Sequence, residues 1–492
     1  MLLSLAVDLG TTSIAAVAVS PDGRIVASVQ APNTASLPDL PVHHAEQDPS
    51  QLRDIAIDVL RELACDLPGT PACLGLTGQM HGLLLIDESR NPLSPLITWQ
   101  DRRANQSCRP TEADPNAPTT TWLTDYLAQC RDLDLERTGC RLAPGYLAVT
   151  LSILNQTGAI PTGACRASFP ADWLAAELTD TPVVTDRSNA AASGVFDLVG
   201  DQWSQSLLAA GGLDETWLPD VVESGTVIGT LVSKWAAKTG LPTGLPVCGA
   251  IGDNQAAVLG SLPSDETAIQ INVGTGGQIN WPISRFQRIP DMDTRYLPHD
   301  RFLVVGAGLA GGDAYAWVNR TVGNWLSTFG EAPSPDRIYD RLSDLAADIP
   351  ADADGLICTP SFRGTRRGPM DRGLFQGITF DNFTPGHVAR AVLSGIAEGF
   401  AWFLENAGEA GPSGCQRIVG SGNGLRHNRL LIDSLASRFG RPVYMTEHAQ
   451  EAAVGAALLA GAECGVWTDL EAAGQSIRLV RHDRTGSRDG IE

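Results

Sequence analysis

The first thirty residues alternate short apolar segments with tight turns, as expected for a β-meander. Apolar stretches occupy residues 3–9, 14–19 and 24–29, and they are separated by Gly-Thr-Thr-Ser at 10–13 and Pro-Asp-Gly at 21–23. Both separating sequences are rich in turn-forming residues. The pattern therefore predicts three consecutive strands joined by short turns.

The rest of the first half contains one clear helical pattern and further short strands. Apolar residues spaced three and four apart predict a helix over 51–63. Short apolar runs predict strands over 72–76 and 83–87.

A similar opening recurs near the middle of the chain. A predicted strand over 267–273, a Gly-Thr-Gly-Gly turn at 274–277 and a return strand over 278–282 repeat the first hairpin. Because the two hairpins are separated by about half the chain, a duplicated architecture is favoured over a chance repetition. The Gly- and Pro-rich segment 240–246 is the expected boundary.

This boundary divides the chain into two predicted α/β domains and a tail. The expected domains are 1–245 and 246–475, and the charged segment 476–492 is expected to fray. Helices are predicted in the second domain at 311–325, 385–406, 428–439 and 451–461.

Composition and charge exclude several classes of protein. Of the 492 residues, 43% are hydrophobic and 18% charged, which excludes a mostly disordered chain. The net charge of −21 disfavours nucleic-acid binding. Neither of the two lysines, Lys234 and Lys238, lies in a P-loop sequence. No uncharged apolar run of about 18 residues exists, so no membrane contact is expected. With no evident signal peptide and scattered cysteines, we expect a cytoplasmic protein.

The two corresponding hairpins carry candidate phosphate-binding residues. Asp8 ends the first strand and precedes Gly10, Thr11, Thr12 and Ser13. Backbone N–H groups and hydroxyls in such a turn can hold phosphate oxygens, and the carboxylate can hold Mg²⁺. The second hairpin offers Gly274, Thr275 and Gly276. Two facing turns could grip one polyphosphate, whereas a single turn of this kind would be read as an ordinary hairpin.

Asp253 is the candidate general base. It follows a predicted strand over 247–251 and precedes a predicted helix that begins at Ala256. An aspartate in this position can accept a proton from a substrate hydroxyl. The alternative is that Asp253 only caps the helix. Asn254, the next residue, is a candidate substrate contact.

Two short segments combine polar groups with an apolar surface, as sugar binding requires. The first offers Gln79, Met80 and His81. The second offers Trp99, Asp101 and Arg102. The alternatives are a structural histidine at position 81 and a surface ion pair between Asp101 and Arg102.

Three glycine-containing segments in the second half are candidates for nucleotide contact or helix packing. Residues 306–311 match G-x-G-x-x-G, but no second strand with an acidic residue follows, so a Rossmann site is not expected. Gly308 and Gly311 could still approach a nucleotide, as could Gly422 and Asn423. The small residues of 451–457 suggest tight helix packing instead.

Taken in order, these segments resemble the FGGY family of carbohydrate kinases over nearly the whole chain. The resemblance implies two actin-like (ribonuclease-H-like) domains that flank a catalytic cleft. It implies that Asp253 is the base, that Met80 and His81 contact the substrate, and that Asp8 helps to place Mg²⁺. The glycine turns would hold ATP. One departure is Ile14-Ala15, where many relatives have a basic residue that this chain lacks.

Within this family, the resemblance points to a ketose substrate. Residues 77–82 are similar to both xylulokinases and sedoheptulokinases, whereas 99–101, Gln255 and 419–423 are closer to sedoheptulokinases. The expected reaction is phosphorylation of sedoheptulose by ATP at a terminal primary hydroxyl. D-xylulose is the alternative substrate, and a non-catalytic sugar-binding protein is the alternative function. The sequence leaves the oligomeric state open, with a homodimer among the candidates.

Overall fold

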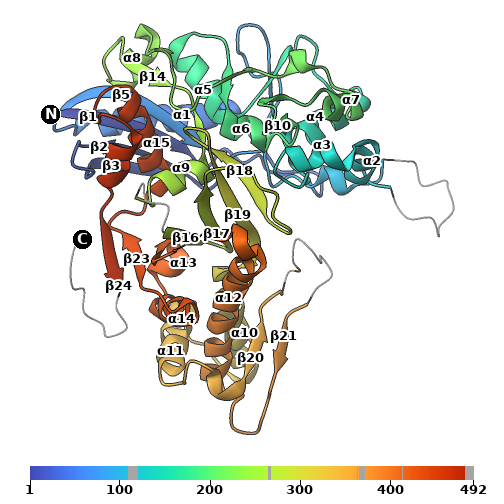
Figure 1. The fold of residues 1–492 in the computed structure, drawn as a ribbon, viewed down its shortest axis with the longest axis vertical. Helices are drawn as coiled ribbons and strands as arrows, with labels where there is room; N and C mark the ends of the chain where they lie inside the picture. The colour runs from blue at the N-terminus through green and yellow to red at the C-terminus, as the bar shows by residue number, and fades with distance from the viewer. Residues whose placement is uncertain (109–119, 264–267, 363, 365–371, 413, 483–492) are drawn as a thin grey trace.

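The computed structural model describes residues 1–108, 120–263, 268–362, 364, 372–412 and 414–482. Figure 1 shows two lobes, each built around a mixed β-sheet, with the start of the chain in the upper lobe. This is the α/β, two-domain arrangement expected from the sequence. Thr267, the first residue of one predicted strand, lies outside the described residues.

The first sheet begins with the predicted meander. β1 (Leu2–Leu9), β2 (Ser13–Val19) and β3 (Ile25–Pro32) pair in antiparallel order, which confirms the three-strand prediction. β5 (Thr70–Gly78) pairs in parallel with β1, so that Asp8 lies opposite Thr77. The remaining strands of this sheet are β13 (Val227–Thr230), β14 (Pro246–Cys248) and β15 (Ile251–Gly252).

The second sheet repeats this arrangement. β16 (Ala268–Val273) and β17 (Gly276–Ile283) form an antiparallel hairpin, and β22 (Arg417–Ser421) pairs in parallel with β16. A hairpin beside a parallel strand therefore occurs in both lobes, as the repeated sequence pattern predicted. The other strands are β18 (Asp293–Leu297), β19 (Arg301–Ala310), β23 (Val443–Thr446) and β24 (Leu479–His482).

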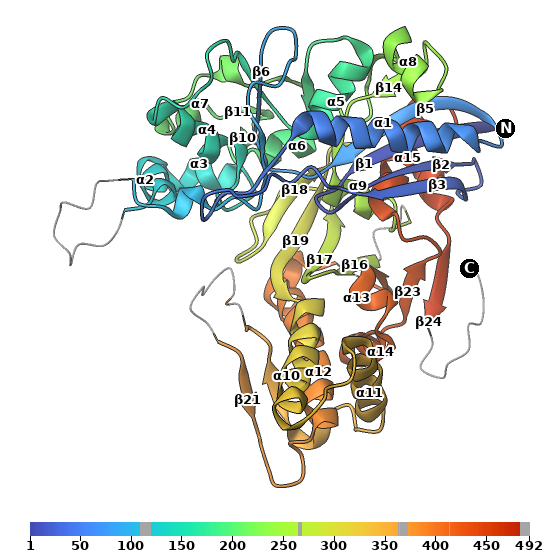
Figure 2. The same cartoon turned by 180° about the vertical axis from the view of Figure 1, so that it is seen from behind.

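The long helices pack their apolar faces on these sheets. α1 (Pro49–Cys65) begins at an Asp48 cap and buries Leu52, Leu60 and Leu63 against the first sheet. The long helices of the second lobe (Figure 2) are α10 (Gly312–Phe329), α11 (Pro335–Ala347), α12 (Pro385–Ala407) and α14 (Arg429–Phe439). The predicted helices at 311–325, 385–406 and 428–439 are confirmed as α10, α12 and α14, with ends shifted by a few residues, whereas α11 was not predicted.

A subsidiary region of the upper lobe has its own apolar core, which includes Leu147, Phe169 and Phe196. Its helices are α2 (Trp122–Gln129), α3 (Asp132–Arg137), α4 (Leu147–Gln156), α6 (Arg187–Ala192) and α7 (Gln205–Ala210). Its strands include β6 (Leu84–Ile86), β8 (Arg166–Ser168), β10 (Phe196–Asp197) and β11 (Gln202–Trp203).

Shorter elements complete the two lobes. The helices are α5 (Pro170–Thr179), α8 (Ser233–Thr239), α9 (Asp253–Leu259), α13 (Asn423–Arg426) and α16 (Leu470–Gln475). The strands are β4 (Glu46–Gln47), β7 (Leu96–Ile97), β9 (Val184–Asp186), β12 (Asp220–Val222), β20 (Ile357–Thr359) and β21 (Leu374–Gln376).

α15 (Glu451–Glu463) is a late segment of the chain that packs on the N-terminal strands. Although it follows the second sheet in sequence, it packs against β1, β5 and α9 beside the first sheet (Figure 1). A Cβ atom added to Gly455 would lie 1.8 Å from the carbonyl oxygen of Ala256. Only a glycine permits so close an approach, as the tight-packing interpretation of this segment predicted.

Three features differ from the sequence predictions. The G-x-G-x-x-G sequence, which contains the candidate nucleotide contacts Gly308 and Gly311, lies largely within a strand, because β19 continues through Ala310 and pairs with β17. The predicted tail is partly ordered, because residues 479–482 form β24 and pair with β23. Residues 483–492 lie outside the described part. The first sheet also extends past the predicted boundary at residue 245, since β14 and β15 pair with β5.

Candidate active site

A cavity of about 400 Å³ lies between the residues of the first and second sheets. This volume is within the range of small-molecule binding sites. Both lobes contribute to its wall, which includes Thr11, Met80, His81, Trp99, Arg102, Ala143, Pro144, Tyr146, Asp253, Asn254, Gln255, Gln278, Asp293, Arg295, Val305 and Ala307.

Asp253 stands in this wall as the first residue of α9, directly after β15. Burial raises its pKa from 3.8 to about 6. The turn before it is fixed by α6, because the Gly252 N–H donates to Ser188 Oγ at 2.9 Å. Ser188 in turn donates to the buried carboxylate of Asp186 at 2.7 Å. The position of Asp253 is therefore set by hydrogen bonds as well as by the sheet.

Asp8 lies close enough to Asp253 for the two carboxylates to interact. The pKa of Asp8 is raised to about 7, mainly by burial and further by the charge of Asp253. Its Oδ1 atom is buried and has no hydrogen-bond partner among the described residues. A buried carboxylate oxygen without a partner, beside a second carboxylate, is a suitable donor set for a hard cation such as Mg²⁺.

Several predicted sugar-binding residues are brought to the cavity. Met80, His81, Trp99, Arg102 and Asn254 all line it. The His81 ring stacks on Tyr146 with centroids 4.2 Å apart. Its Nδ1 lies 2.8 Å from the carbonyl oxygen of Ala192.

The Trp99 indole also touches the first turn. Its Nε1–H donates to Thr11 Oγ1 at 2.9 Å. One face of the predicted sugar site is therefore tied to the predicted phosphate turn, although these residues are far apart in the sequence.

Two predicted contacts, Gln79 and Asp101, are not part of this wall. The Gln79 amide is buried and donates to Gln47 Oε1 at 2.8 Å. Asp101 is fully buried and accepts the Ala45 N–H at 2.9 Å. Both side chains are therefore used to hold the surrounding loops together.

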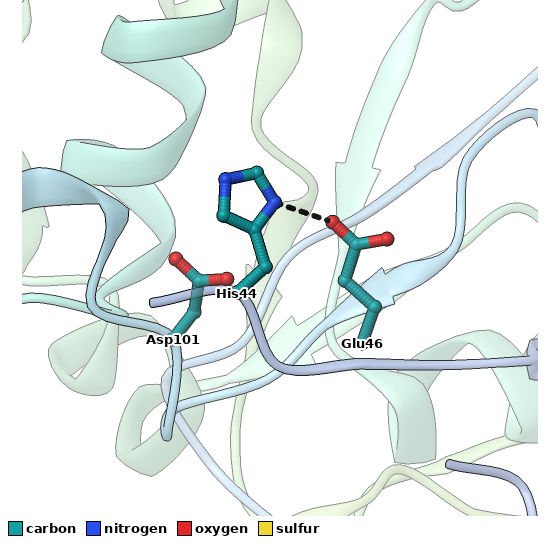
Figure 3. Close-up of side chains that lie close together, drawn as sticks. All are labelled: His44, Glu46 and Asp101. Carbon is teal, nitrogen blue, oxygen red and sulfur yellow. Dashed lines mark ion pairs between the residues drawn. The ribbon is translucent and has the colours of Figure 1, made fainter. Parts of the chain in front are cut away.

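Asp101 pairs with Arg103, and not with Arg102 as the ion-pair alternative proposed. Arg103 donates to both oxygens of Asp101, at 2.8 and 2.9 Å, and to Glu46 at 2.5 Å. Figure 3 shows that His44 stands between these two acids in the view drawn. Arg103 therefore already donates to both carboxylates, so these oxygens have a protein partner without a metal ion.

Close packing assembles the glycines of the second lobe. The N–H groups of Gly312 and Asp313 donate to the carbonyls of Gly274 and Thr275 at 2.9 and 3.1 Å. A Cβ atom on Gly311 would lie 2.5 Å from Gly276. The second turn therefore lies against the N-terminal end of α10.

Gly422 and Asn423 join this group from the neighbouring strand. Gly422 has a φ of +85°, and a Cβ atom there would lie 2.4 Å from Asn272 Oδ1. Asn423 begins α13 directly after it. The two residues are thus placed at the end of β16, beside the predicted phosphate turn.

The remaining predicted nucleotide contacts lie in two other places. In the first turn, the Gly10 carbonyl accepts the Asn33 amide at 2.9 Å, Thr12 is exposed and Ser13 begins β2. Gly308 does not line the cavity of Asp253. It lines a separate cavity of about 350 Å³ beside α12, together with Leu309 and Ala310.

Sequence reasoning missed the contribution of β18 and of Tyr146. Asp293 and Arg295 project into the wall from β18, and Arg295 Nη2 donates to the Tyr146 hydroxyl at 3.0 Å. Neither residue belongs to a recognisable motif. Their spacing of two residues on a strand, which places both on one face, was the only available signal.

Sequence comparisons identify the family. Models of the N-terminal and C-terminal domains of the FGGY family of carbohydrate kinases match residues 3–260 and 273–464. The chain belongs to the FGGY family of carbohydrate kinases. The N-terminal match includes β14, β15 and α9, which agrees with the extent of the first sheet.

Individual relatives of this kinase cover nearly its whole length. A xylulose kinase from Bacillus subtilis (strain 168) is 28% identical over 484 residues, with 95% of this chain and 89% of that protein covered. A glycerol kinase from Trichlorobacter lovleyi is also 28% identical, over 490 residues, with 94% and 90% covered.

A solved structure confirms the fold. The crystal structure of xylulose kinase from Rhodospirillum rubrum has a TM-score of 0.85 at 26% identity, and 98% of this chain and 93% of that chain are covered. None of the described helices of the kinase combines the length and apolar character needed to cross a membrane.

Proposed function

We propose that this carbohydrate kinase phosphorylates a ketose at a terminal primary hydroxyl, with ATP as the phosphoryl donor. The observation that carries the proposal is Asp253, which lines a sugar-sized cavity at the start of α9. Its pKa of about 6 is close to neutral. A carboxylate with such a pKa is ionised at neutral pH and remains a competent proton acceptor.

In the proposed reaction, Asp253 orients the primary hydroxyl and accepts its proton. The hydroxyl oxygen then forms a bond to the γ-phosphorus of ATP, and the bond from that phosphorus to the β–γ bridging oxygen breaks. ADP leaves, and the proton on Asp253 passes to solvent. Catalysis of this kind depends mainly on positioning and on stabilising charge at the transferring group.

The nucleotide would be held by the two turns and the adjoining glycines. The proposed contacts are Gly10, Thr11, Thr12 and Ser13 in the first lobe, with Gly274, Thr275, Gly276, Gly311, Gly422 and Asn423 in the second. Their backbone N–H groups suit phosphate oxygens. Gly308 is the least supported of the predicted contacts, because it lines a different cavity.

Asp8 is the proposed ligand for Mg²⁺. Its Oδ1 atom accepts no hydrogen bond from any described residue, so this oxygen is free to bind a cation. When bound, Mg²⁺ neutralises negative charge on the phosphates. Ile14 and Ala15 follow this turn and are buried in the sheet, so positive charge at the turn would come from the bound ion and from backbone N–H groups, and not from a side chain at these two positions.

The sugar would contact Met80, His81, Trp99, Arg102 and Asn254, which share the wall with Asp253. Gln79 and Asp101 would support these contacts from behind, because their polar atoms already have protein partners. This arrangement offers both an apolar face and polar groups to a polyhydroxylated ligand.

Two ketoses are the leading substrates. Residues 99–101 and 419–423 resemble the corresponding segments of sedoheptulokinases, which favours sedoheptulose. The similarity to the Bacillus subtilis protein named xylulose kinase favours D-xylulose. ADP release with the two sugars side by side, together with glycerol and other polyols, tests the proposal. Turnover of neither ketose, or sugar binding with no ADP release, would contradict it and favour another acceptor or a non-catalytic role.

A further inference from the structure

The cavity contains a buried cationic side chain, one nitrogen of which no described residue engages. Arg295 lines the cavity from β18 and is only 6% exposed. Its Nη2 donates to Asp293 at 2.8 Å and to the Tyr146 hydroxyl at 3.0 Å. Its Nη1, although buried, has no hydrogen-bond partner anywhere in the described chain.

A buried acceptor in the same wall is also without a partner. Gln255 is completely buried, and its Nε2 donates to the carbonyl oxygen of Tyr296 at 3.2 Å. Its Oε1 has no donor among the residues that the structure describes. Gln255 lies two positions after Asp253, so it is held at the same end of α9.

Such groups are rarely left unsatisfied in a folded protein, because an unpaired buried polar atom is costly. We propose that Arg295 and Gln255 form a specificity subsite, in which substrate hydroxyls supply the missing partners. A hydroxyl can accept from Arg295 and can donate to Gln255. This inference rests on the proposed sugar kinase function and names the residues that select its substrate.

The charges around Arg295 restrict the chemical class of the ligand. Asp293 already pairs with the guanidinium, and both Asp293 and Asp253 line the cavity. A carboxylate or phosphate on the substrate would meet these acids as well as the arginine. A neutral polyhydroxylated sugar satisfies the donor and the acceptor without that repulsion.

The number of hydroxyls that the subsite needs also favours a larger polyol than glycerol. Arg295 comes from β18 of the second sheet, whereas Asp253 comes from α9, which packs beside the first sheet (Figure 1). A sugar with several hydroxyls can occupy both Asp253 and Arg295. Once one hydroxyl of glycerol is at Asp253, only two hydroxyls remain to bind Arg295 and Gln255.

The test is Arg295→Lys, with kcat/KM measured for sedoheptulose, D-xylulose and glycerol. Lysine keeps a charge beside Asp293 but cannot present the second guanidinium nitrogen. We expect a loss of about 10- to 100-fold for the preferred ketose, mainly through KM, and little change for glycerol. The ratio of ketose to glycerol activity should fall accordingly.

Arg187→Lys is a matched control. Arg187 also contacts a carboxylate, Asp201, and a tyrosine hydroxyl, that of Tyr296. It does not line the cavity. The control should leave the ketose-to-glycerol ratio unchanged. Equal losses for ketose and glycerol in Arg295→Lys, or no loss for either, would overturn the proposal.

A second variant and a binding measurement keep the test independent of catalysis. Gln255→Met removes the acceptor with little change in volume, and calorimetric titration with each sugar without ATP should show weaker ketose binding. If Asp253→Asn retains turnover, the proposed function is wrong. The binding titrations still measure whether Arg295 and Gln255 contribute to sugar binding. A wild-type protein that binds glycerol as tightly as both ketoses would overturn the proposal.

Discussion

Asp253→Asn is predicted to abolish turnover and, at the same time, to stabilise the ligand-free protein above pH 6. Burial raises the pKa of Asp253 from 3.8 to about 6. Ionisation of this carboxyl group is therefore less favourable in the folded state than in the unfolded chain. The difference between these two pKa values corresponds to about 3 kcal/mol.

The sign of this effect follows from proton binding. Between pH 3.8 and about 6 the folded state holds more protons at Asp253 than the unfolded chain does. The free energy of unfolding of the wild type therefore decreases as the pH rises through this window. Asparagine does not ionise, so the variant escapes this loss. The advantage should be absent near pH 3 and should reach up to about 3 kcal/mol at pH 8.

Urea unfolding of both proteins at pH 3.5, 5 and 8 without Mg²⁺ or nucleotide measures the stability difference, and ADP release measures turnover. Asp101→Asn is the control, because Asp101 is a buried acid that pairs with Arg103. That variant should lose stability at pH 8, since it leaves a buried guanidinium without one of its carboxylates. Near-normal turnover of Asp253→Asn, or equal stability of variant and wild type at all three pH values, would refute the reasoning.

Three further perturbations test the packing, the positioning of the base and the cation site. Gly455→Ala should destabilise the protein by about 1–3 kcal/mol in urea unfolding, because its Cβ would lie 1.8 Å from Ala256 O. Ser188→Ala removes the acceptor of the Gly252 N–H, so kcat should fall while KM for ATP stays unchanged in steady-state assays. Asp8→Asn should raise the Mg²⁺ concentration needed for half-maximal activity about tenfold or more, as measured by Mg²⁺ titration at fixed ATP.

Each of these predictions has a control or a contradicting result. Glu463→Ala alters an exposed position of the same helix as Gly455 and should be nearly neutral. A proportional rise in KM for ATP would show that Ser188 acts on the nucleotide site instead of on Asp253. An unchanged Mg²⁺ requirement in Asp8→Asn would remove Asp8 from the cation site.

Local sequence patterns were sufficient for much of the fold. The meander at the start of the chain and the hairpin at β16 and β17 follow from apolar runs separated by turn residues. The long helix α12 follows from apolar periodicity between Thr384, which caps it, and Gly408. These features depend on neighbours in the sequence, which is why they are readable without tertiary information.

Sequence patterns gave the wrong prediction where a segment from another part of the chain pairs with, or hydrogen-bonds to, the residues concerned. The glycines of 306–311 look like a phosphate turn, yet pairing with β17 extends β19 through most of them. The segment 476–492 as a whole is charged, yet its residues 479–482 (Leu-Val-Arg-His) pair with the edge strand β23. Asp101 looks like a sugar contact, but Arg103 and Ala45 occupy its oxygens.

The sequence by itself determined the type of several long elements, such as α1, α12 and α14, together with the repeated hairpins and the candidate base. Only the tertiary structure decided which polar side chains share a cavity. Asp8 and Asp253, whose charges interact, are more than two hundred residues apart in the sequence. Arg295 shares a cavity wall with Asp253 only because strand pairing and helix packing bring their elements together. Burial and unsatisfied hydrogen-bonding capacity are properties of that assembly, because they arise from what surrounds a group and not from its place in the chain.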